Sequence, residues 1–165
     1  MKIVLAENSA EIRRIFIEYF TMTWSEFQNR NQEWIESAAK QNYIVRYEKL
    51  YLWELMEHPP FSFYQALELL RSMEGDVLLM SENASKPHCR GIIIDGKERK
   101  GAVAKANAAE LADLIESEWN EVGRRCILPK DLYVFDELLE RLLVFTHEYD
   151  GKGRRYCKMV GFKCP

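Results

Sequence analysis

The residues best suited to chemistry follow an apolar run near the carboxyl terminus. Residues 142–149 read LLVFTHEY, which places His147 and Glu148 where a predicted strand ends. The next loop contains glycine and carries Arg154 and Arg155. An imidazole and a carboxylate can transfer protons, and a guanidinium binds anions. Because loops held by a rigid sheet often carry function, this strand end is the first candidate site.

The strand pattern separates the two proton-transfer groups. Successive side chains of a strand point to opposite faces. We therefore expect His147 and Glu148 to lie on opposite faces of the sheet. His147 would share its face with Leu143 and Phe145. The two groups then cannot act together as an acid–base pair, and we interpret His147 as hydrogen-bonded framework.

The partner of this strand is the apolar run LYVF at 132–135, joined to it by the polar turn DELLER. Both runs are apolar on both faces, which predicts a central antiparallel hairpin covered on both sides. No catalytic set is assigned to this hairpin. The residues predicted to bind a ligand or a partner at its mouth are Tyr133, Asp136, His147, Glu148, Arg154 and Arg155.

Other chemistries lack their motifs. Zinc ligands usually lie a few positions apart on one turn, a spacing that the histidines and cysteines of this chain do not have. We therefore predict no metal ion, no cofactor and four reduced thiols. GxSxG and GxxxxGK[ST] motifs are missing. The opening MKIVLAENSAEIRR resembles the start of a two-component receiver domain, but Glu7-Asn8 stands in place of its acidic pair, and the phospho-accepting aspartate is missing.

A scaffold of helices and strands must hold the candidate residues. Helices are predicted from Tyr43 to Glu57 and at four capping-box pairs, which are Asn8/Glu11, Thr23/Glu26, Ser62/Gln65 and Asn107/Glu110. Strands are predicted at 1–7, 76–81, 90–95 and 154–162 and in the hairpin within 131–149, with a turn at Asp95-Gly96 and a charged loop tip at 96–101. The expected fold class is α+β, in which a helix-rich amino-terminal half packs on a mainly antiparallel sheet from the carboxyl-terminal half. We expect a single domain over 1–165.

The bulk composition limits the class of protein. The chain has 165 residues, of which 47% are hydrophobic and 30% charged, as is usual for a folded globular domain. The net charge of -3 argues against a nucleic-acid binder. No apolar run approaches the roughly 20 residues of a membrane span. The opening residues are too short for a signal-peptide core, so we expect a cytoplasmic protein without membrane contact.

Positive charge is concentrated in two segments, 86–105 and 152–163. If the two segments meet on one face, they make a basic patch that steers an acidic partner toward the protein. If they do not meet, they form an ordinary solvated rim. The sequence leaves both arrangements open.

The segment DLYVFDELLERLLVFTHEYDGKGRRYCK, 131–158, resembles the carboxyl-terminal signature of a group of small bacterial proteins of unknown function. Their pattern is Asp-Leu/Ile-Tyr-Val-x-Asp, a short turn, and a tryptophan-containing strand that ends in Thr-His-Glu before a glycine-rich turn. The matching residues here are Asp131, Tyr133, Asp136, Thr146, His147 and Glu148. YLWEL at 51–55 also resembles an upstream motif of that group, whereas Arg141-Leu142 stands where the tryptophan is expected. The resemblance implies a fold relationship and a bacterial origin, and it transfers no activity.

The lack of a catalytic constellation and the aromatic content of 12% favour a non-enzymatic factor that binds another protein, of the immunity or inhibitor type. Two alternatives stay open. One is a small enzyme with a site at the mouth of the 131–155 hairpin, where His147 or Glu148 acts with Asp136 and one of the two arginines. The other is a protein that binds an acidic ligand or nucleic acid through the basic segments.

Overall fold

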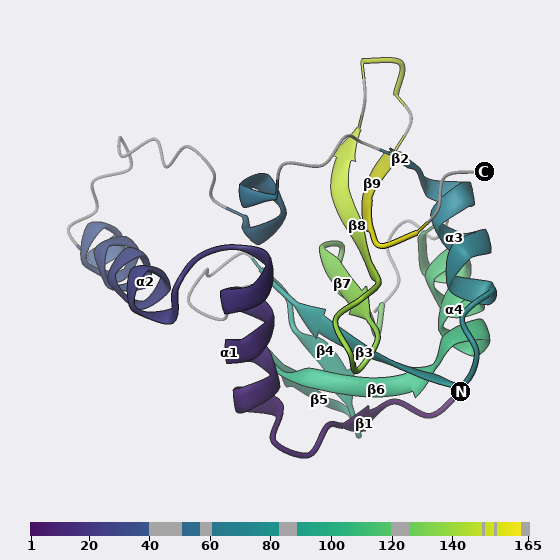
Figure 1. The fold of residues 1–165 in the computed structure, drawn as a ribbon, viewed down its shortest axis with the longest axis horizontal. Helices are drawn as coiled ribbons and strands as arrows, with labels where there is room; N and C mark the ends of the chain where they lie inside the picture. The colour runs from purple at the N-terminus through teal and green to yellow at the C-terminus, as the bar shows by residue number, and fades with distance from the viewer. Residues whose placement is uncertain are drawn as a thin grey trace.

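The computed structural model describes residues 1–39, 51–56, 61–82, 89–119, 126–149, 151–153 and 155–162 (Figure 1). The elements in chain order are β1 (Val4–Leu5), α1 (Ser9–Phe20), α2 (Trp24–Ala39), the 3-10 helix η1 (Leu52–Leu55), β2 (Phe61–Ser62), α3 (Phe63–Arg71), β3 (Asp76–Ser81), β4 (Ile92–Ile94), β5 (Lys97–Arg99), β6 (Val103–Asn107), α4 (Ala108–Trp119), β7 (Leu132–Phe135), β8 (Leu142–Tyr149) and β9 (Arg155–Val160).

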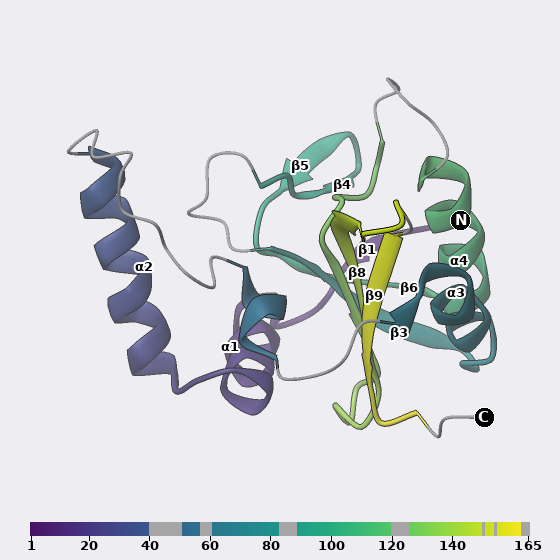
Figure 2. The same ribbon diagram turned by 90° about the horizontal axis from the view of Figure 1, so that it is seen from above.

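The main sheet has seven strands in the order β1-β6-β3-β7-β8-β9-β2, and β4 and β5 form a separate two-stranded sheet. Every strand pairing in the described ranges is antiparallel. Figure 2 shows α1 and α2 on one side of the main sheet and α3 and α4 on the other. The predicted α+β class is confirmed.

The β7–β8 hairpin lies in the middle of the sheet and is covered on both faces, as its apolar pattern predicts. One face packs in a core with α3 and α4 through Leu132, Val134, Leu143 and Phe145. The opposite face packs in a core with α1 and η1 through Tyr133, Phe135, Leu142 and Val144. Burial of each large apolar side chain contributes about 1.5–3 kcal/mol, so this hairpin is a rigid base for the groups at its ends.

The expected division between a helical first half and a sheet-forming second half is only partly present. Three strands, β1, β2 and β3, come from the first half of the chain. The predicted strand at 76–81 is confirmed as β3, and it pairs with both β6 and β7. Because an inner strand needs a partner on each edge, the sheet cannot be built from the second half alone.

Two of the predicted capping pairs form hydrogen bonds. Glu26 accepts the backbone N–H of Thr23 at 2.9 Å, and the N–H of Glu26 donates to Thr23 Oγ1 at 3.3 Å, which confirms this capping box. At α4 the Asn107 side chain accepts the N–H of Glu110 at 3.2 Å. This cap satisfies one of the donors that a helix start leaves without an intrahelical acceptor.

The other two predicted caps are wrong. Asn8 has a left-handed backbone, with φ 56°, and its side chain makes no cap bond. A capping side chain needs an extended backbone at this position. Glu11 instead forms an ion pair with Arg14, at 2.7 Å. Ser62 has the extended backbone of a cap but makes no side-chain bond, and nothing in the structure explains why.

Two other expectations change in the structure. The predicted turn at Asp95-Gly96 is present, with φ 49° and 73°. Strand β5 follows this turn directly and pairs with β4, because a two-residue turn of this kind joins two antiparallel strands; the expected loop tip at 96–101 is therefore wrong.

Of the predicted helix at 43–57, the structure describes 51–56, where η1 is a single 3-10 turn, and the remainder lies outside the described residues. None of the described helices has both the length and the apolar character needed to cross a membrane.

Candidate functional site

The end of β8 departs from regular strand geometry. Phe145 pairs with Cys157 and Tyr149 pairs with Arg155, so β8 advances four residues while β9 advances two. Such a bulge turns side chains away from the faces that simple alternation gives them. His147 accordingly lies beside Tyr51 rather than with Phe145, at a ring-centroid distance of 4.9 Å.

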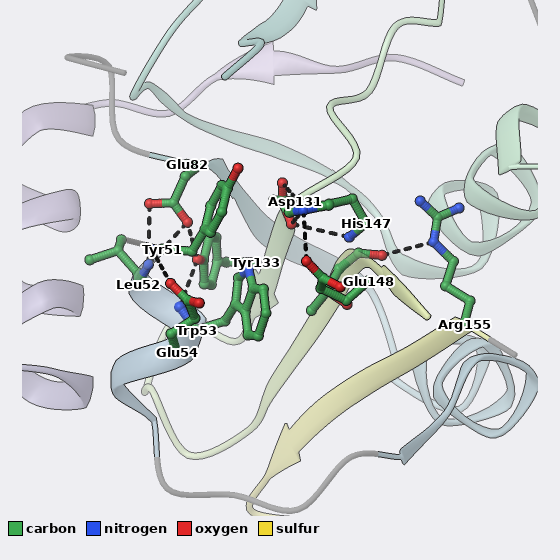
Figure 3. A network of polar contacts seen from close by, with 11 residues as sticks. Tyr51, Leu52, Trp53, Glu54, Glu82, Asp131, Tyr133, His147, Glu148 and Arg155 are labelled. Carbon is green, nitrogen blue, oxygen red and sulfur yellow. Dashed lines mark hydrogen bonds and ion pairs between the residues drawn. The ribbon is translucent and has the colours of Figure 1, made fainter. Parts of the chain in front are cut away.

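The expectation that His147 and Glu148 point to opposite faces is wrong. His147 Nε2 lies 3.1 Å from a Glu148 carboxylate oxygen. The other ring nitrogen, Nδ1, lies 2.8 and 2.9 Å from the two carboxylate oxygens of Asp131, which also accepts the backbone N–H of His147 at 3.2 Å. A protonated imidazole can donate to both carboxylates at once. The three side chains therefore form a continuous polar chain (Figure 3).

Exposure increases along this chain from Asp131 to Glu148. The Asp131 side chain is 12% exposed, that of His147 30% and that of Glu148 47%. Asp131 directly precedes the buried strand β7, which fixes its position. A carboxylate held by the core thus orients an imidazole, and the imidazole orients a carboxylate at the surface.

A second polar network lies next to the first and is buried. The Glu82 carboxylate accepts the N–H of Leu52 at 3.1 and 3.3 Å and also accepts the hydroxyl of Tyr133. The Tyr133 oxygen in turn accepts the N–H of Trp53 at 3.0 Å. Burial, and then the charge of Glu82, raise the pKa of Tyr133 well above its usual value, so its hydroxyl stays protonated and donates. This network fixes the backbone of η1 on the sheet.

Lys158 from β9 holds the same short helix from its other end. Its buried ammonium donates to the carbonyls of Trp53 and Met56, both at 2.8 Å. Buried charges are stable only when they are paired or hydrogen-bonded. Two buried charged groups, Glu82 and Lys158, therefore specify one position for the segment 51–56. That position sets the Tyr51 ring against His147, and burial raises the pKa of Tyr51 to about 12.

Arg155 extends from β9 toward Trp119 at the end of α4. Its Nε donates to the carbonyl of Thr146 at 2.8 Å. The central carbon of the guanidinium is 3.5 Å from the centre of the Trp119 ring and 5.5 Å from that of Tyr149. Burial lowers the pKa of the Arg155 guanidinium to about 10. The side chain is thus fixed by one hydrogen bond and by contact with two aromatic rings.

The structure brings some of the predicted binding residues together and separates others. His147 and Glu148 are in contact, and Arg155 binds the carbonyl of Thr146 at the same strand end. Tyr133 is in the core and belongs to the Glu82 network. Asp136 lies at the opposite end of the hairpin, where it binds Arg141 Nε at 3.0 Å. Arg154 lies outside the described residues.

Sequence reasoning missed several residues of the site. Asp131 had no clear signal, because the extended register of the hairpin places it opposite Thr146, and only the irregular pairing between Phe145 and Tyr149 brings His147 beside it. Glu82, Lys158 and Tyr51 had none, since they meet only when η1 packs on the sheet.

Two lysines of the basic segments do not contribute to a shared patch. Lys105 is paired with Glu137 at 2.9 Å and with Asp76 at 4.0 Å, and Lys158 is buried. Cys89, Cys126 and Cys157 are thiols that form no disulfide bond. Within the described ranges, no group of three histidine, cysteine or acidic side chains is arranged to hold a metal ion.

No protein-family model, curated protein or solved structure matches this chain. The resemblance to the small bacterial group stays a prediction. The site must therefore be interpreted from its own geometry.

Proposed function

We propose that this chain is a cytoplasmic bacterial factor, non-enzymatic and of the immunity or inhibitor type, that binds another protein. Its contact surface is the end of the β8–β9 ribbon, which we call the ribbon-end surface and define as Tyr51, His147, Glu148, Tyr149 and Arg155. Tyr149 is 59% exposed, and the others are partly or largely exposed. Tyrosine and arginine are enriched among the residues that dominate binding energies at protein interfaces.

The observation that carries the proposal is the fixed position of Glu148. Its carboxylate reaches solvent but is oriented by His147, which is itself oriented by Asp131. Ordering a flexible side chain at an interface costs about 0.5–1.5 kcal/mol. A side chain that is already ordered avoids this cost, so this arrangement suits recognition of a donor or cation on a partner.

A second candidate function is acid–base catalysis at the same place, and the Asp131–His147 contact favours it. A carboxylate on Nδ1 orients an imidazole for proton transfer through Nε2. Here Nε2 is occupied by Glu148 at 3.1 Å, so a substrate would have to displace that carboxylate. This requirement makes catalysis the less favoured proposal.

The binding proposal is tested by co-purification from the source cells over a range of salt concentrations, followed by titration of the purified companion. We expect Glu148→Gln and Tyr149→Ala each to weaken the complex at least tenfold, which corresponds to about 1.4 kcal/mol. Tyr64→Ala is the matched control, because Tyr64 is 63% exposed on α3, and it should leave the affinity unchanged. Equal affinity of all three variants would reject this surface, and recovery of the chain alone at every salt concentration would reject protein binding.

The catalytic candidate is tested on p-nitrophenyl esters and phosphates. Turnover that His147→Gln abolishes and that Tyr149→Ala retains would replace the binding proposal by a catalytic one. Equal rates for the wild type and His147→Gln would remove the catalytic candidate for these substrates.

A further inference from the structure

Within the described part of the chain Arg155 forms no ion pair with an acid, and the charge of Asp131 is a minor influence on it. Two other arginines do form such pairs: Arg14 lies 2.7 Å from Glu11, and Arg71 lies 3.0 Å from Asp113. For Arg155 the recorded contacts are the Thr146 carbonyl and two aromatic rings. A half-buried guanidinium that is not ion-paired interacts strongly with an anion that reaches it, because water screens it less than a fully exposed one.

The same contacts determine which atoms stay available. Nε donates to Thr146, and the flat face of the guanidinium stacks on Trp119. The two terminal nitrogens remain, and in Figure 3 no dashed line joins them to the other residues drawn. They form a planar fork of donors, the geometry that binds the two oxygens of one carboxylate through parallel hydrogen bonds.

We infer that the Arg155 guanidinium, stacked on Trp119 beside Tyr149, is a receptor for a single carboxylate group. This inference rests on the proposed function in naming the carboxylate as one from the bound protein, an aspartate, a glutamate or a chain terminus. The fork of a guanidinium also binds phosphate, but a phosphate has about two charges, and moving it from water to a half-buried site with one positive charge costs more than moving a carboxylate there. Arg155 and Glu148 flank Tyr149, so the ribbon-end surface presents one fixed cation and one fixed anion to its partner.

The receptor is tested on the full chain by titration with sodium acetate and, separately, with inorganic phosphate, at constant ionic strength maintained with chloride. Nuclear magnetic resonance follows the Nε–H signal of Arg155 and the indole N–H of Trp119. We expect both signals to shift saturably with acetate, with an affinity at least fivefold higher than for phosphate. Arg99 lies in the exposed strand β5, and its Nε–H signal provides the matched control that should not saturate.

Arg155→Lys keeps the charge but removes the fork, and we expect it to reduce the acetate response of Trp119 at least fivefold. Three results would each overturn the inference: an Arg155 response no larger than that of Arg99, tighter binding of phosphate than of acetate, or an unchanged response in Arg155→Lys.

The acetate titration and the measurement of partner binding can fail independently. If acetate fails while Glu148→Gln still weakens the complex, only the receptor is wrong. If no companion is found but acetate saturates at Arg155, the protein-binding function is wrong and the carboxylate site remains.

Discussion

Replacement of Tyr133 by phenylalanine tests the network that positions η1. The substitution removes one oxygen that is fully buried, that donates to Glu82 and that accepts the N–H of Trp53 at 3.0 Å. A hydrogen bond to a charged group contributes about 1.5–3 kcal/mol, and a buried donor left without a partner costs about 1–3 kcal/mol. Glu82 keeps its two contacts with the N–H of Leu52, so we expect the loss to be below the sum, at about 3 kcal/mol.

A loss of this size is a large part of the roughly 5–15 kcal/mol that stabilises a typical domain, yet the chain should still fold. Urea unfolding followed by circular dichroism gives the free energy of unfolding. With a denaturant slope of about 2 kcal/mol/M, the midpoint should fall by about 1.5 M. Hydrogen exchange adds a local measurement, since the amides of Leu52 and Trp53 should lose protection before those of β7.

Tyr64→Phe is the control, because the Tyr64 side chain is 63% exposed and its hydroxyl is not required by the core. Its effect should stay within about 0.5 kcal/mol. The reasoning is refuted if Tyr133→Phe costs no more than Tyr64→Phe. It is also refuted if the amides of Leu52 and Trp53 exchange as slowly in Tyr133→Phe as in the wild type.

Two further predictions concern Gly161, which directly follows β9, and Cys157 within β9. Gly161→Ala should destabilise the fold by more than about 3 kcal/mol in urea unfolding, because Gly161 has φ 77° and an added Cβ would lie 1.7 Å from the carbonyl oxygen of Glu140. Gly151→Ala, which has open space around its Cβ, should change stability little, and equal effects would contradict this account. Burial raises the pKa of the Cys157 thiol to about 12, so at pH 8 iodoacetamide should alkylate half-buried Cys126 at least about 100-fold faster than Cys157, as mass spectrometry can measure. Comparable rates would contradict the burial of Cys157.

The sequence was most informative where a local pattern decides the structure. Two runs that are apolar on both faces predicted the central hairpin, and the dipeptide Asp95-Gly96 predicted the turn between β4 and β5. Strand alternation failed at His147, because a bulge depends on how β8 pairs with β9 and leaves no mark in the apolar pattern. A capping motif was likewise insufficient at Asn8, where the left-handed backbone prevents the side chain from capping.

The candidate site was only partly predictable for a related reason. His147, Glu148 and Arg155 were found because they are polar residues at a strand end. The groups that fix them come from distant parts of the chain and are not recognisable locally. Glu82 and Lys158 are charged residues whose burial is caused by η1 covering them, and Asp136 was included only because it is close to the hairpin in sequence.

The most direct test of the proposed function is the dissociation constant of the complex between this chain and its co-purified companion, for the wild type and for Asp131→Asn. Asp131 is nearly buried and contacts His147, so the variant removes a charge that positions His147 without replacing any of the exposed contact residues. The account predicts an affinity about tenfold lower, about 1.4 kcal/mol, with the fold retained by circular dichroism. An unchanged dissociation constant would show that the fixed position of Glu148 has no part in recognition.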